Sequence, residues 1–217
     1  MPTQSDRVAL TTGGTGEAAA ECEAAAEDAK MSDLWDFNKP YLSNLLIMML
    51  CWQALGFTNT LVSFEMKYLE GDIFINSYTA ALAETIAKLG AGVVLVQLGT
   101  KPLFAAAFLI AFAGSLNLLN LTEGSDPFLA SVFIMMTKFG VSMGWVAACM
   151  CLIELFPASL VATAFGLCNV AAKLVCMVAP IVAEVKPPTP MMIVAVITAF
   201  AGLLSQKFKL QNQLKEV

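Results

Sequence analysis

The residue in this sequence best placed to do chemistry is a lysine in the middle of an apolar segment. Lys173 lies within residues 161–183, and its neighbours for two helical turns on each side are mostly Ala, Leu, Val, Cys and Met. A lysine at the centre of a membrane costs about 3 kcal/mol on insertion scales, so it normally faces a polar cavity or a charged partner. Two interpretations stay open: Lys173 binds an anionic group of a solute, or it forms a structural ion pair with an acid on another helix.

Three further charged residues lie inside apolar segments. Glu84 and Lys88 are four residues apart in the acid-before-base order that favours a helical ion pair. They could neutralise each other, or Lys88 could reach a cavity while Glu84 tunes its charge. Lys138 could line the same pathway or extend its ammonium to the membrane interface. Glu154, by contrast, is expected at the cytoplasmic end of its helix, where it would hold a hinge loop instead of meeting a solute.

Trp145 is the aromatic candidate, because small residues such as Ser142, Gly144 and Ala148 surround it in the sequence. In such surroundings an indole could form a flat wall against an aromatic solute. Packing against a neighbouring helix is the alternative interpretation.

The sequence offers no catalytic or metal-binding constellation. It contains no histidine, no serine or cysteine nucleophile with a partner, and no C-x-x-C spacing. The segment TTGGTG near the amino terminus does not have the context of a phosphate-binding loop. We therefore expect no enzyme activity, no cofactor, no metal and no nucleic-acid partner, and the chemistry that remains is recognition of a solute within a membrane.

The composition is that of an integral membrane protein. Of the 217 residues, 58% are hydrophobic and 13% are charged, and the mean hydropathy is +0.74. The net charge of -5 is confined to residues 1–41, which hold eight acids and three bases. We expect this segment to be a disordered acidic tail, and residues 207–217 to be a basic tail.

The apolar segments predict an all-α fold with several spans of about 20 residues, the length needed to cross a bilayer. Six windows qualify: 42–64, 76–98, 103–121, 127–153, 161–183 and 190–206. An even number of spans places both termini on one side, and the lysines of residues 207–217 favour the cytoplasm for that side. We expect a multi-pass protein of the plasma membrane rather than of an organelle.

Four stretches carry a family resemblance. They are YLEGDIFINSYTAALAE at 68–84, ETIAKL at 84–89, KFG at 138–140, and ELFP at 154–157 followed by a small-residue helix that ends in Ala179-Pro180. Together they resemble the carboxyl-terminal six-helix half of a major facilitator transporter, in the branch of organic cation, organic anion and carnitine transporters. The resemblance covers roughly residues 42–206, and it implies one bundle of a two-bundle fold that works by alternating access.

The resemblance also implies a substrate class. The position of Lys173 is acidic in cation transporters and basic in anion and carnitine transporters, so a lysine here implies a small organic anion or zwitterion. The candidate substrate-binding residues are Lys173, Lys88, Trp145, Glu84, Asn59 and Asn169. The candidate motif or conformational residues are Lys138, Gly99, Lys101, Glu154, Pro157 and Pro180.

The sequence departs from the family pattern at the cytoplasmic face. Val96 and Gln97 stand where an acid and a base belong, and Val161 stands where the ELFP motif usually continues to an arginine. An alternative hypothesis is therefore a degenerate, transporter-like structural or accessory subunit of a membrane assembly. Because only one bundle is encoded, the expected partners beside lipid are a missing amino-terminal half, a second copy of the chain, or a larger membrane complex.

Overall fold

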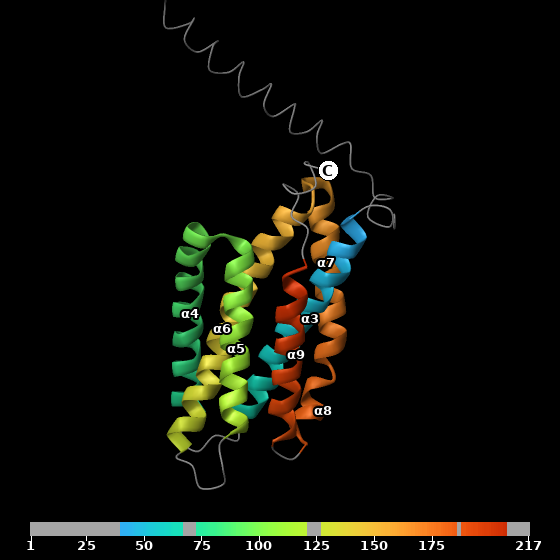
Figure 1. Cartoon of the computed structure of the whole chain (residues 1–217). Helices are drawn as coiled ribbons and strands as arrows, with labels where there is room; N and C mark the ends of the chain where they lie inside the picture. The colour runs from blue at the N-terminus through green and yellow to red at the C-terminus, as the bar shows by residue number, and fades with distance from the viewer. Residues whose placement is uncertain (1–39, 67–72, 121–126, 186–187, 208–217) are drawn as a thin grey trace, which may run out of the picture.

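The part of the chain that the structure describes is built from helices. The computed structural model describes residues 40–66, 73–120, 127–185 and 188–207, and no strand occurs in them (Figure 1). The helices are α3 (Pro40–Glu65), α4 (Ile73–Leu98), α5 (Thr100–Leu119), α6 (Pro127–Leu155), α7 (Ala158–Cys176), α8 (Ala179–Ala183) and α9 (Thr189–Ser205). The predicted acidic tail, 1–41, and basic tail, 207–217, lie outside the described residues except for residues 40, 41 and 207.

Each predicted span has a helical counterpart, and five are long and apolar enough to cross a membrane. These are Tyr41–Glu65, Ser77–Leu98, Thr100–Leu119, Phe128–Leu155 and Ala158–Ala183. The sixth, α9, has 17 residues. At 1.5 Å per residue it is about 26 Å long, which is shorter than the hydrocarbon core of about 30 Å.

The fifth span, Ala158–Ala183, contains the predicted window 161–183, but the α-helix is interrupted within it. The α-helix stops at Cys176 and resumes at Ala179. Pro180 explains the break, because it has no N–H to donate to the carbonyl of Cys176, four residues earlier, and its ring clashes with that carbonyl. Pro180 instead occupies the first turn of α8, where its missing N–H costs little.

The helices are arranged with α3 and α6 in the centre and α4 and α7 at two edges (Figure 1). Among the described residues, helix α3 contacts α6, α7, α8 and α9, whereas α4 packs mainly against α6 and, to a smaller extent, α5. The apolar windows of α3 and α6 are 61% and 56% buried, but those of α4 and of the α7–α8 span are only 17% buried. The edge helices therefore expose most of their surface.

Glycine allows a close helix crossing between α5 and α6. A Cβ added at Gly140 of α6 would lie 2.5 Å from the amide nitrogen of Ala111 and 2.7 Å from the carbonyl oxygen of Ala107. These are backbone atoms, so they cannot move aside without shifting α5. Gly114 of α5 fits in the same way against Thr137 of α6. Small residues are the usual means by which membrane helices approach closely.

This crossing generates a stability prediction. Gly140→Ala should lower the melting temperature in detergent, because overpacking a close contact costs about 1–3 kcal/mol, more than the roughly 1 kcal/mol by which alanine favours a helix over glycine. Gly166→Ala in α7 is the matched control, since no atom lies within 4 Å of its added Cβ. Melting curves by circular dichroism that rank Gly140→Ala at or above wild type would contradict the described crossing.

Candidate functional site

Glu84 of α4 lies between two lysines. Its Oε1 is 2.8 Å from the Nζ of Lys138 on α6, and its Oε2 is 3.8 Å from the Nζ of Lys88, one turn further along α4. Lys138 is only 6% exposed, so the interpretation in which its ammonium extends to the interface is wrong. The predicted Glu84–Lys88 pair is present, but the shorter contact of Glu84 is with Lys138, which the sequence did not predict.

The parallel course of α4 and α6 brings these charges to one level of the bundle. Glu84 and Lys138 each lie eleven residues after the first residue of their helix, Ile73 and Pro127 respectively. The residues with which α4 packs inward are small: Ala80, Ala87 and Ala91 are all buried. Because they are small, α4 can approach closely enough for the two side chains to pair across the interface.

The surface of α4 has one polar and one apolar sector. Ser77, Ala81, Thr85 and Lys88 follow one another at helical spacing and are exposed, and they lie beside Glu84. The adjoining sector carries large exposed side chains: Tyr78, Leu82, Ile86, Leu89, Val93 and Val96. Only the apolar sector suits contact with lipid chains, so the polar sector requires a different environment.

An aromatic cluster joins α3, α6 and α7. Trp52 of α3, which is 1% exposed, packs edge-on against Trp145 of α6 at a centroid distance of 5.1 Å and against Phe165 of α7 at 5.4 Å. Its indole Nε1 donates a hydrogen bond to Oδ1 of Asn169 at 3.4 Å. Edge-to-face contacts of this kind are favourable aromatic geometries. Trp145 therefore packs against a neighbouring helix, as one of the two interpretations predicted, and it remains half-buried.

Trp52 and Phe165 were not predicted from the sequence as site residues. A signal for Trp52 was available, because it lies near the middle of the first span, whereas membrane tryptophans are enriched at the interfaces. An indole N–H at that depth needs an acceptor, and Asn169 supplies one. Asn59 lies two turns after Trp52 on the same side of α3 and is half-buried.

Lys173 is exposed on α7, one turn after Asn169. Within the described residues its side chain forms no hydrogen bond or ion pair, so the interpretation that it pairs with an acid on another helix finds no support there. It ends a row of exposed or half-buried small and polar residues at helical spacing: Ala162, Gly166, Asn169 and Lys173. The adjoining sector is apolar and exposed at Val170, Leu174 and Met177. Like α4, α7 thus has a polar sector beside a lipid-compatible one.

The helices that carry these groups are neighbours in the order α4, α6, α3, α7. On α6, Lys138 and Trp145 are seven residues apart, so they lie on the same side of that helix. This side of α6 connects the Glu84 ion pairs to the aromatic cluster. Glu84, Lys88 and Lys138 therefore form one group of contacts, and Trp145 and Asn169 belong to a second group around Trp52.

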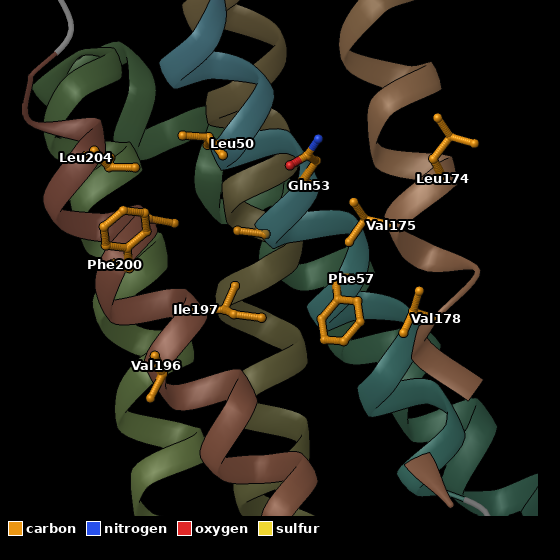
Figure 2. Close-up of a pocket in the computed structure, with 12 residues that line it drawn as sticks. Leu50, Gln53, Phe57, Leu174, Val175, Val178, Val196, Ile197, Phe200 and Leu204 are labelled. Atoms are coloured by element: carbon orange, nitrogen blue, oxygen red, sulfur yellow. The ribbon is translucent and has the colours of Figure 1, made fainter. Parts of the chain in front are cut away.

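Two cavities in the bundle lie elsewhere. The larger, of about 590 Å³, is an open groove over α3 between α7 and α9 (Figure 2). A second, of about 360 Å³, lies between α5 and α9. None of the predicted site residues lines either one. The larger groove is apolar apart from Gln53, and its other labelled lining residues include Leu50, Phe57, Leu174, Val178 and Phe200.

Four of the predicted motif residues, Gly99, Lys101, Glu154 and Pro157, lie at the end of the bundle where α4 connects to α5 and α6 connects to α7. Lys138 lies within α6, and Pro180 lies in α8. Gly99 links α4 to α5 with a φ of +84° and a ψ of -178°, a conformation that is essentially restricted to glycine. The Thr100 hydroxyl donates a hydrogen bond to the carboxylate of Glu154, so the first turn of α5 is held against the last turn of α6. Pro157 follows as the N-cap residue of α7. Glu154 thus connects α6 to α5, whereas the sequence predicted that it would hold the hinge loop between α6 and α7.

Comparison with known proteins places the chain near a transporter family. No protein-family model matches it. Solute carrier family 22 member 12 from Homo sapiens is 30% identical over 161 residues, which are 72% of this chain and 29% of that protein. The chain is therefore similar to part of a solute carrier. The chain spans less than a third of the length of this relative.

The ion pairs lead to a second stability prediction. Lys138→Met should lower the melting temperature more than Lys88→Met, because removing one partner of a buried pair is costly, whereas exposed helical pairs contribute only about 0.3–0.5 kcal/mol. Thermal melts of both variants in the same detergent check the order. Equal melting temperatures would contradict the dominance of the Glu84–Lys138 contact.

Proposed function

We propose that the chain forms part of a transporter for a small organic anion or zwitterion. The observation that carries this proposal is the ammonium of Lys173, which lies exposed and without a partner among the described residues, on the polar sector of a membrane-spanning helix. A charge in that position requires water, a ligand or another protein surface. A carboxylate or similar anion satisfies the requirement by charge complementarity.

Lys173 would bind the anionic group, and Lys88 would provide a second positive charge from α4. Trp145, supported by Trp52, would offer an aromatic edge to the body of the solute. Asn59 and Asn169 would add hydrogen-bonding groups; the amide oxygen of Asn169 is already held by the Trp52 indole.

A complete site requires a second bundle. Transporters with internal repeats bind their substrate near the midplane between two bundles and rock one against the other. The polar sectors of α4 and α7 offer the surface for such a partner, which would be an amino-terminal half, a second copy or a component of a larger complex. In this arrangement motion at the helix ends is controlled by Gly99, Lys101, Glu154, Pro157 and Pro180. Both termini are cytoplasmic, and the membrane is the plasma membrane.

Binding of radiolabelled benzoate to purified protein in liposomes tests this proposal. Wild-type protein should bind benzoate at least about tenfold more tightly than its neutral isostere benzamide, a difference of about 1.4 kcal/mol. Glycine betaine serves as a zwitterionic probe. Benzylamine, a cation, should not compete with benzoate for the site.

Lys173→Met should remove this preference for benzoate. Lys207→Met is the matched control, because Lys207 is exposed in the turn that follows α9, outside the proposed site. Equal affinity for benzoate and benzamide in wild-type protein, or full benzoate affinity in Lys173→Met, would contradict the proposed substrate class.

A second candidate function is a structural or accessory subunit of a membrane assembly. The positions that carry latch charges in the resembling family are Val96, Gln97 and Val161 here, and Val96 is 87% exposed without any charge to contribute. Switching between two conformations would be impaired without those charges, whereas a static role would not need them.

The two candidates differ in what accompanies the protein on purification. An accessory subunit should be isolated with a different membrane protein at fixed stoichiometry after mild detergent extraction, and it should show no preference for benzoate. A self-paired dimer that binds benzoate would contradict the accessory role.

A further inference from the structure

The buried lysine of α6 has no place in the proposed substrate contacts, and its geometry points to a different role. Lys138 is 6% exposed and donates a hydrogen bond to Oε1 of Glu84 at 2.8 Å. Burial keeps its ammonium from a solute on the open face. Whatever Lys138 contributes to anion recognition must therefore pass through Glu84.

Glu84 is shared unequally between its two lysines. The ammonium of Lys138 is at hydrogen-bonding distance from one carboxylate oxygen, whereas the ammonium of Lys88 is 3.8 Å from the other. The Lys88 side chain is also 55% exposed, against 7% for Lys138. Charge-assisted hydrogen bonds are strong at the shorter separation, and exposed ion pairs are weak. The Lys88 ammonium is thus only partly engaged and faces outward.

The net charge of the cluster depends on Lys138. Two ammonium groups and one carboxylate leave one positive charge, and no other charged side chain among the described residues pairs with these three. Without Lys138 the remaining pair would be neutral. Glu84 would then have Lys88 as its single cationic partner. It would hold the Lys88 ammonium, which is the group that faces the solute.

We propose that Lys138 is a positioning residue, the counter-ion that engages Glu84 so that Lys88 stays available for an anionic ligand. This inference rests on the proposed anion-binding function and explains how an acid can lie beside an anion site without abolishing it. It also assigns Glu84 a role in lowering anion affinity, with Lys138 limiting that effect.

A double-mutant cycle in the full chain tests the inference, with benzoate binding in liposomes as the readout. Lys138→Met should weaken benzoate binding about tenfold, because Glu84 would then neutralise Lys88. Glu84→Gln should leave binding equal to or tighter than wild type. The double variant Glu84→Gln/Lys138→Met should return to within about threefold of wild type, because one free positive charge is restored. A merely structural role of the Glu84–Lys138 pair would also be rescued by the double variant, because removing both partners leaves no unpaired charge. The reactivity of the Lys88 amine therefore has to separate the two roles.

The availability of the Lys88 amine supplies a readout without ligand. Its rate of reductive methylation, measured by mass spectrometry, should fall several-fold in Lys138→Met and recover in the double variant. Lys207→Met is the control, since it also removes one positive charge but lies in the turn after α9 and outside this cluster.

The outcomes separate the two proposals. Absence of benzoate binding in wild-type protein would overturn the proposed function and, with it, the ligand role of Lys88. Binding that Lys138→Met leaves unchanged, or that the double variant fails to recover, would overturn the counter-ion inference alone. An unchanged methylation rate of Lys88 in Lys138→Met would do the same.

Discussion

The constraint on which the rest of this structure depends is the cost of a charge in a membrane. Ionisable groups at bilayer depth have to meet water, an opposite charge or a ligand. Two lysines of this chain meet that requirement in different ways. Lys138 is buried and paired with Glu84 across the α4–α6 interface. Lys173, on the other edge helix, has no such partner among the described residues and lies at the surface. The first lysine is part of the bundle's own structure, while the second requires something outside it.

The scaffold that presents these charges is closely packed in its interior. Gly140 and Gly114 bring α5 and α6 together, and the edge-on contacts of Trp52 tie α3 to α6 and α7. Rigid packing of this kind holds side chains in place. The edge helices, which carry Lys88 and Lys173, have few inward contacts and expose both a polar and an apolar sector. One face of the bundle therefore lacks the cover that its polar groups need.

The helices themselves were predictable from the sequence because a run of about 20 apolar residues has few alternatives in a membrane. Pro180 lies inside such a run, so hydropathy alone gave no sign of a break in the fifth span. The missing N–H of Pro180 explains why the α-helix is interrupted there. The Glu84–Lys88 pair followed from local spacing. The pairing of Glu84 with Lys138 did not, because it depends on the register of two helices that are not consecutive. The contacts of Trp52 with Trp145, Phe165 and Asn169 were missed for the same reason.

The most direct test of the central claim asks whether position 173 faces water while its neighbour faces lipid. In protein whose six native cysteines are replaced by alanine, Lys173→Cys and Leu174→Cys would be treated in liposomes with a negatively charged, membrane-impermeant thiosulfonate. Leu174 is the matched position, because it is the next residue of α7, is 63% exposed and lines the apolar groove. The claim predicts rapid modification at position 173 and little at position 174. Equal, slow modification at both positions would contradict it, because Lys173 would then face lipid.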